Sequence, residues 1–166
     1  MKRILILLAA LLLCLGAAAQ NGKSIYQKYS DAEHVSAVYI SPAMFRLIGR
    51  IPDLETREGN VNLTPVIRSL TGMYILNSEN PDINGSLRSE VERFIRSGKY
   101  ELLMEAKNDG ETVRMYTVGS EQIINGFVML AAQADEVTFI CLDGQMPREQ
   151  FETLVAEQMS DGEPSA

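Results

Sequence analysis

The sequence predicts an α+β fold, with a mostly antiparallel sheet that ends in a four-strand meander and helices packed on one face. The prediction depends on the stretch from Tyr100 to Gly144, whose short apolar runs are separated by turn-like breaks at Asp109-Gly110 and at residues 133–136. Strands joined by such short turns pair with their sequence neighbours in antiparallel directions. Apolar residues at helical spacing occur before and after this stretch, so helices are available to cover one face of the sheet.

The first 19 residues have the three parts of a secretory signal peptide. A basic end is followed by an apolar run at 4–15 that is too short to span a bilayer, and small residues precede a cleavage site after Ala19. The alternative is a lipoprotein signal acylated at Cys14, which is disfavoured because Leu13 stands where a small residue is needed. We therefore expect an exported protein, either periplasmic or extracellular.

Cleavage would leave residues 20–166, which we divide into a single α+β domain at 20–160 and a disordered polar tail at 161–166. Two of the 15 Lys and Arg residues leave with the signal, which changes the formal charge from −7 to −9. An acidic chain without a basic cluster disfavours nucleic acid and anionic membrane surfaces as partners, and no second membrane-spanning segment follows. Cys141 is the only cysteine that remains, so no intrachain disulfide can form.

The start of the domain predicts a helix, a strand and a second helix. Ser24 can cap a short helix, and the alternating residues Val35–Ile40 predict a strand. Ser41-Pro42 has the residue types of a helix start, and apolar positions at helical spacing continue to Ile51. The polar residues 53–60 that follow form a connector without periodicity.

The middle of the chain predicts two more helices with a strand between them. Apolar residues at 63–70 repeat at helical spacing, Gly72 ends that helix, and the run 73–76 reads as a strand. Residues 77–85, rich in Asn, Asp, Pro and Gly, predict a loop before a third helix at 87–95. After the meander a last helix begins at Pro147 and carries an apolar face made by Phe151, Leu154 and Val155.

The turn at Asp109-Gly110 fixes the pairing of the first hairpin. Both residues tolerate positive φ, which a two-residue hairpin turn requires. With the turn placed there, Met104 faces Met115, Glu105 faces Arg114 and Ala106 faces Val113, whereas a shift by one residue would mix charged and apolar side chains on both faces.

The second hairpin pairs the run 123–132 with the run 137–142. Six consecutive apolar residues at 127–132 carry no period of their own, so they could also form a helix. A strand is favoured because Gly126 and the β-branched residues Ile123, Ile124 and Val128 suit one.

No catalytic, cofactor or metal residue is assigned from the sequence. The run from Asn80 to Gly85 imitates half of a calcium-binding loop, but Val91 stands where a bidentate carboxylate must close the coordination sphere, so a turn is favoured. Cys141 is a nucleophile that only His34 could activate, yet it lies in the most apolar strand, where a cysteine is usually inert. Three glutamates could supply paired carboxylates, or else the solvent face of a strand: Glu101, Glu105 and Glu111.

The first hairpin motivates the leading functional hypothesis. Its outward set, Leu103, Tyr116 and Val118, is more apolar than a solvated face requires. We therefore expect a non-enzymatic exported binding domain whose protein partner lies on the uncovered sheet face or along its edge. The alternatives are a small thiol-dependent or hydrolytic enzyme that uses Cys141, and a structural component of the cell envelope.

Several segments together resemble domain-of-unknown-function family 4252, a family of small exported proteins found mainly in Bacteroidetes. The resemblance implies a bacterial envelope location and no assigned activity, so it supplies no catalytic residues. Members of that family more often carry a lipobox cysteine, and Leu13 is a departure from that pattern. The resemblance is carried by the signal peptide, the short tyrosine-containing helix and three runs: Val35-Ser36-Ala37-Val38-Tyr39-Ile40-Ser41 leading into Met44-Phe45, Leu70-Thr71-Gly72-Met73-Tyr74-Ile75-Leu76, and Phe139-Ile140-Cys141-Leu142-Asp143-Gly144.

The signal peptide gives the first testable prediction. Intact-mass spectrometry of the exported protein should give the mass of a chain that begins at Gln20, because a signal peptidase cuts after small residues. Replacement of Ala19 by Leu should leave the signal attached. A product that begins at a lipid-modified Cys14 would instead establish the lipoprotein alternative.

Overall fold

The computed structural model describes residues 21–50 and 64–153. Several sequence expectations fall outside these residues: the signal peptide with Cys14, the connector at 53–60, and the tail at 161–166. Within the described ranges the chain forms a six-stranded sheet in the order β1-β2-β6-β5-β4-β3, and every neighbouring pair is antiparallel. The strands are β1 (Val35–Ile40), β2 (Leu70–Ser78), β3 (Glu101–Asn108), β4 (Glu111–Gly119), β5 (Ile123–Ala132) and β6 (Val137–Pro147).

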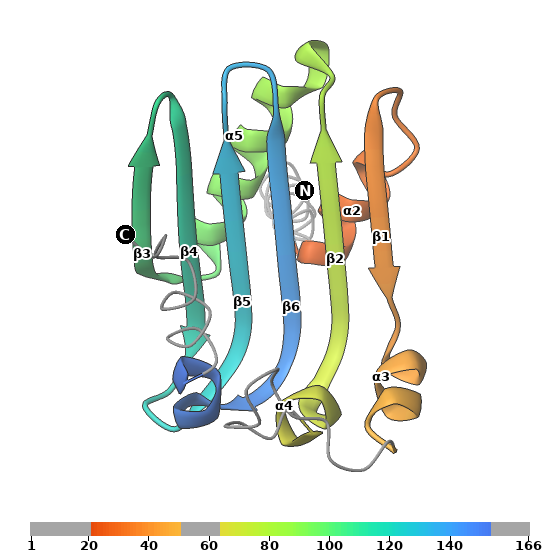
Figure 1. Cartoon of the computed structure of the whole chain (residues 1–166), viewed down its shortest axis with the longest axis vertical. Coiled ribbons are helices and arrows are strands. Elements are labelled where there is room, and N and C mark those ends of the chain that lie inside the picture. The colour runs from red at the N-terminus through yellow and green to blue at the C-terminus, as the bar shows by residue number, and fades with distance from the viewer. Residues whose placement is uncertain (1–20, 51–63, 154–166) are drawn as a thin grey trace, which may run out of the picture.

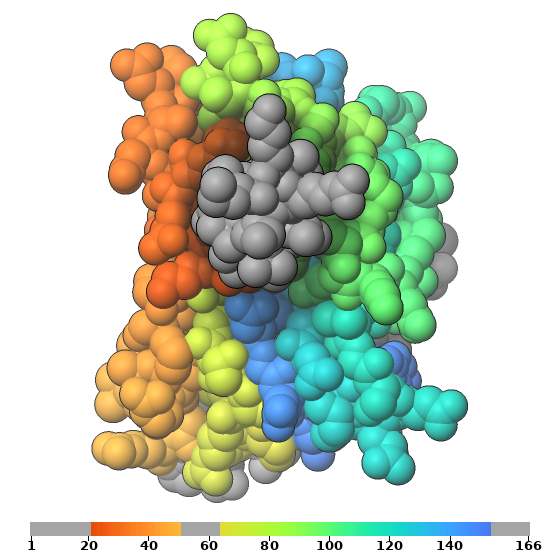
Figure 2. Space-filling model, turned by 180° about the vertical axis from the view of Figure 1, so that it is seen from behind, coloured from red at the N-terminus to blue at the C-terminus, as the bar shows by residue number. Residues whose placement is uncertain are grey.

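Helices α2 (Gly22–Tyr29) and α5 (Pro81–Ser97) cover one face of the sheet (Figures 1 and 2). The short helices α3 (Pro42–Ile48) and α4 (Thr64–Ser69) lie at one end of the strands, together with helical residues 148–153. The α+β class, the four-strand meander from β3 to β6 and the helix-covered face are therefore confirmed. We call the face under α2 and α5 the helix face, and the opposite one the open face.

The main hydrophobic core lies between the helix face and its two helices. Alternate residues of the central strands point into it, and Leu76, Phe139 and Val128 are fully buried there. Leu87, Val91, Phe94 and Ile95 of α5 and Ile25 and Tyr29 of α2 close the core from the other side. A hydrogen bond from Tyr29 Oη to Glu90 Oε2 at 2.8 Å, with an ion pair between Lys28 and Glu90, joins the two helices.

A second, smaller core lies where the open face meets the short helices. Phe127 of β5 packs against Phe151 with ring centroids 5.2 Å apart, and Phe45 of α3 and Val66 of α4 complete the cluster with buried Met146. This cluster ties the short helices to the end of the sheet. The middle of the open face carries no described helix (Figure 1).

Two helix starts differ from the sequence prediction. The cap of α2 is Asn21, whose Oδ1 accepts a hydrogen bond from Ser24 N at 2.8 Å, so Ser24 is the third helical residue of a capping box. The segment 77–85 is not a loop, because α5 begins at Pro81 with Asn80 as its cap. The same arrangement of a cap and a proline begins α3 at Ser41-Pro42, as predicted.

Two strands run through glycines that the sequence reading placed at their ends. β2 begins at Leu70 and passes through Gly72, and β6 passes through Gly144 to Pro147. Close packing explains both positions, because a Cβ on Gly144 would lie 2.5 Å from the backbone oxygen of Ser69. These glycines permit close contact inside the sheet rather than ending it.

The predicted register of the first hairpin and the predicted strands of the second hairpin are confirmed. Met104 pairs with Met115 and Glu105 with Arg114, and the turn residues Asp109 and Gly110 have φ of 41° and 88°. The register shifts between Leu102 and Met104, so Tyr116 pairs with Leu102 and not with Leu103. The second hairpin pairs Ala132 with Val137, and residues 127–132 are strand.

The fold predicts a large loss of stability on truncation of Phe139. Its side chain is fully buried at the centre of the main core, so Phe139→Ala should lower the free energy of unfolding by about 3–5 kcal/mol, measured by urea denaturation. Leu103→Ala is the matched control, because Leu103 is 41% exposed and should change stability by less than about 1 kcal/mol. Equal losses in the two variants would contradict the described core.

Candidate binding surfaces

Cys141 is sealed inside the main core. Its side chain is fully buried, and a Cβ on Gly22 at the start of α2 would lie 2.4 Å from its Sγ. Burial raises the pKa of the thiol strongly, and the neighbouring Asp143 carboxyl raises it further. The thiol therefore stays protonated and out of reach of a substrate.

His34 does not approach Cys141. Cys141 pairs with Tyr74, which pairs with Tyr39, whereas His34 precedes β1 by one residue. His34 lies five residues before Tyr39, which corresponds to roughly 16 Å along the strand direction. Two strand spacings then separate Tyr39 from Cys141, so His34 lies still farther from the thiol. His34 is exposed, and no Cys–His pair comes together among the described residues.

The calcium-like run is the first turn of α5. Asn80 Oδ1 accepts a hydrogen bond from Asp82 N at 3.0 Å, and Asn84 is buried with its Nδ2 donating to the backbone oxygen of Asp135 at 2.8 Å. These oxygens and amides serve helix capping and loop attachment. In the described part of the chain, no group of three or more His, Cys, Asp or Glu side chains is placed to hold a metal ion.

The glutamates of the first hairpin do not form a pair suited to glycoside chemistry. Glu105 accepts a hydrogen bond from Arg114 Nε at 2.6 Å and pairs with Lys107 Nζ at 2.7 Å. The side-chain hydrogen bonds from Lys107 and Arg114 hold the pKa of Glu105 below its usual value. Glu101 and Glu111 lie at opposite ends of the hairpin.

The predicted outward set of the first hairpin does not lie on the open face. Tyr116 lies on the helix face, where Val128 is its cross-strand neighbour. It packs, half-buried, against the main core. Val118 is half-buried on the same side, near Gly126. Only Leu103 is exposed, in the irregular part of β3. The faces of this hairpin are therefore reversed relative to the prediction.

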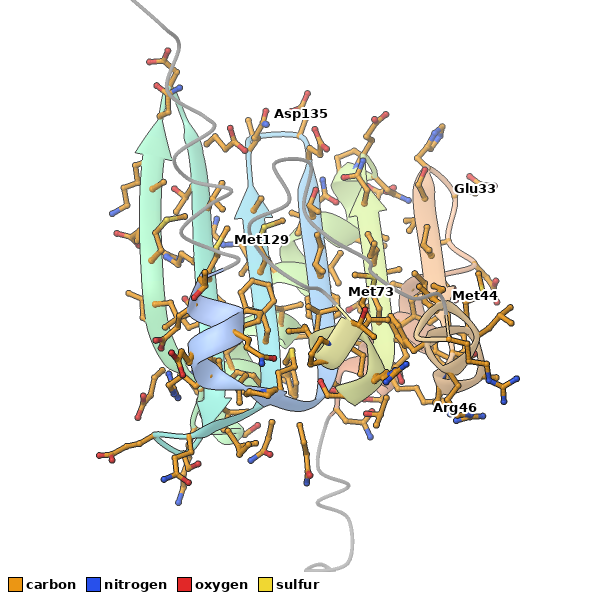
Figure 3. The ribbon with its side chains drawn as sticks, turned by 60° about the horizontal axis from the view of Figure 1, so that its bottom comes forward. Glu33, Met44, Arg46, Met73, Met129 and Asp135 are labelled. Atoms are coloured by element: carbon orange, nitrogen blue, oxygen red, sulfur yellow. The ribbon has the colours of Figure 1, made fainter. Side chains whose placement is uncertain are left out.

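The open face is apolar along its whole width. One row of paired residues crosses all six strands, and the neighbouring row adds Met73 and Leu142. Figure 3 shows Met73 and Met129 on this side of the sheet. The residues of the crossing row are Val38, Ile75, Ile140, Met129, Met115 and Met104.

The two edges of the sheet differ in how they meet solvent. β3 carries Glu101, Glu105 and Lys107 and an irregularity after Leu102, which are features that discourage pairing with another strand. β1 has none of them: its six residues are uncharged, contain no proline and pair with β2 without a register shift. Val38 and Tyr39 of β1 are 47% and 44% exposed.

Opposite charges flank the β1 edge. The exposed acids Glu33 and Glu79 lie at its beginning, and the exposed Arg46 of α3 and Arg50 lie beyond its end. Figure 3 shows Glu33 and Arg46 near these two ends. None of these four side chains makes an ion pair with another described residue. The edge therefore has unpaired charge at both ends and an uncharged middle.

A shallow polar pocket of 790 Å³ lies at one end of the helix face. Figure 2 shows atoms of β6 at the surface of this region, between those of β2 and those of β5. Asp143 is the only ionisable residue among the described lining residues. Burial raises the pKa of its carboxyl, although a hydrogen bond from Cys141 lowers it. The lining residues are Ser69, Thr71, Asn125, Asp143, Gly144 and Gln145.

Two tyrosine hydroxyls flank the Asp143 carboxyl. Asp143 pairs with Gly72 on one side and Gly126 on the other, and a Cβ on either glycine would lie 2.8 Å from a tyrosine oxygen, Tyr74 Oη or Tyr100 Oη respectively. Burial and the Asp143 charge raise the pKa of Tyr74 to about 12. Both hydroxyls are therefore neutral and able to donate or accept a hydrogen bond.

Sequence reasoning did not single out Asp143. The signal available was a carboxylate two residues after Cys141 in an otherwise apolar strand, which places it on the same face as that buried thiol. A charged side chain on the buried face of a strand is unusual and often functional. The two tyrosines could not be found this way, because their positions depend on pairing between distant strands.

The chain belongs to domain-of-unknown-function family 4252, whose model matches residues 29–154. The resemblance drawn from the sequence is therefore confirmed. No curated protein matches the chain. None of the helices in the described ranges has the length and hydrophobicity needed to cross a bilayer.

The seal over Cys141 gives a testable prediction. Ellman's reagent should modify Cys141 in the native protein at least about 100-fold more slowly than in denaturant, because the thiol is buried and protonated. Thr71→Cys is the control, since Thr71 is exposed and one of the two thiols should then react at once. Rapid modification of Cys141 without unfolding would restore the thiol-enzyme alternative.

Proposed function

We propose that the protein is a non-enzymatic exported domain of the bacterial cell envelope that binds a second protein along strand β1. The signal-like N-terminal sequence supports export, and membership of a family without an assigned activity is compatible with a binding role. The buried thiol and the separation of His34 from it count against thiol catalysis.

The observation that carries the proposal is the contrast between the two edge strands. An edge strand presents unpaired backbone donors and acceptors, and exposed edges are usually blocked by charge, proline or a bulge. β3 is blocked in this way, whereas β1 is not. An unblocked edge with large exposed apolar side chains fits strand addition, in which backbone hydrogen bonds supply affinity and alternate side chains supply specificity.

The charges around β1 define the chemistry of the partner. We assign to the partner an extended segment whose middle is apolar, with a basic residue to meet Glu33 and Glu79 and an acidic residue to meet Arg46. The formal charge of −9 that we expect after removal of the signal opposes pairing between two copies of this chain. A different, less acidic protein is therefore the partner that we propose.

Site-specific photo-crosslinking in the producing cells tests the proposal. A photoreactive residue in place of Val38 should give one discrete adduct with another protein, and the crosslinked segment should be extended and apolar. The same residue in place of Leu103 is the matched control, because the two side chains are 47% and 41% exposed on opposite edges. A second substitution, Tyr39→Lys, should lower the yield of this adduct at least about tenfold, since a lysine on an edge strand hinders pairing.

Three outcomes would overturn the proposal. The first is an adduct of two copies of this chain, and the second is equal labelling from the two edges. The third is the absence of an adduct from position 38 while the variant remains folded.

A further inference from the structure

Among the described residues, no cation compensates the carboxylate of Asp143 in this pocket. Its carboxyl has one hydrogen-bond partner among the described residues, the thiol of Cys141, at 3.7 Å. Each described ion pair lies elsewhere in the fold, and none includes Asp143. An ionised carboxylate that is partly removed from water and left without a cation destabilises the fold.

The surroundings of this carboxylate are built from neutral hydrogen-bonding groups. Ser69 and Thr71 supply hydroxyls, and Asn125 and Gln145 supply amides. The hydroxyls of Tyr74 and Tyr100 lie over Gly72 and Gly126, the glycines of the two flanking strands. Glycine at both cross-strand positions leaves room beside Asp143, which the two tyrosine hydroxyls occupy. The opening therefore leads to one negative charge surrounded by oxygen acceptors.

We propose that this pocket binds a small organic cation, a primary ammonium or a guanidinium group, with Asp143 as its counter-ion. Such a group donates several N–H hydrogen bonds and carries the missing charge, so it satisfies the carboxylate and the surrounding oxygens together. The site is separate from the β1 edge and does not rest on the partner proposed there.

The raised pKa of Asp143 agrees with this assignment. A carboxyl whose pKa is higher in the folded than in the unfolded protein leaves stability unchanged below its unfolded pKa. Its cost to folding develops as pH rises from the unfolded to the folded pKa and is complete above the folded pKa. A bound cation lowers the pKa of Asp143 and so offsets the loss of folding stability that ionisation of Asp143 causes. Binding should therefore strengthen as pH rises through the pKa of Asp143 and weaken when the ligand loses its own proton.

Butylamine and butanol are matched probes, because they share a carbon chain and differ in charge. Titration of the isotope-labelled mature domain with butylamine at neutral pH should shift the NMR amide signals of Thr71, Asn125 and Gln145, and butanol should not. Asp143→Asn should weaken butylamine binding at least about tenfold, since it removes the charge and keeps the shape. Asp135→Asn is the control, because it makes the same change at an exposed acid in the β5–β6 turn.

Stability measurements separate binding from folding. Asp143→Asn should be at least as stable as the original protein at neutral pH, so a loss of binding cannot be assigned to unfolding. Butylamine should also lower the pKa of the Asp143 carboxyl measured by carbon-13 NMR. Equal binding by the Asp143→Asn variant, equal binding of butanol, or an unchanged Asp143 pKa with saturating amine would each overturn the proposal.

Discussion

Two helices are too narrow to cover a six-stranded sheet, and this mismatch shapes the rest of the molecule. Six strands span about 24 Å between the outer chains, whereas two α-helices side by side cover about 20 Å. The central strands β2, β5 and β6 are therefore buried on the helix face, and the outer strands extend past the helices. The outer strands β1 and β3 are therefore more exposed to solvent than the central strands.

The outer strands solve the problem differently. Next to β3 the helix face carries charged side chains. Arg114 of β4 forms an ion pair with Glu105 of β3 and lies 3.9 Å from Glu92 of α5. At β1 no charged group takes part, and apolar side chains remain in contact with solvent. The same sheet therefore has one outer strand with its hydrogen-bonding edge protected by charge and one without that protection.

Local rules were sufficient for the order of the elements and for the hairpin registers. The Asp109-Gly110 turn set the pairing of Met104 with Met115, because two-residue turns leave little freedom. The sequence did not show which face of that hairpin is covered, since both faces carry some apolar side chains and the position of α5 decides between them. The start of α5 was missed although Asn80-Pro81 carries the same cap signal as Ser41-Pro42. The Asp143 pocket depends on pairing between β2 and β6, about 70 residues apart, which no local pattern encodes.

The difference between the two outer strands also limits how large an assembly can grow. A sheet that accepted strands on both sides could lengthen without end, as fibrils do. Here only β1 has an unprotected edge. Copies of this domain could therefore not extend the sheet through β3, because β3 is protected by charge and by an irregularity. Complexes formed by the strand addition that we propose at β1 should therefore be closed and of fixed stoichiometry, even at high protein concentration.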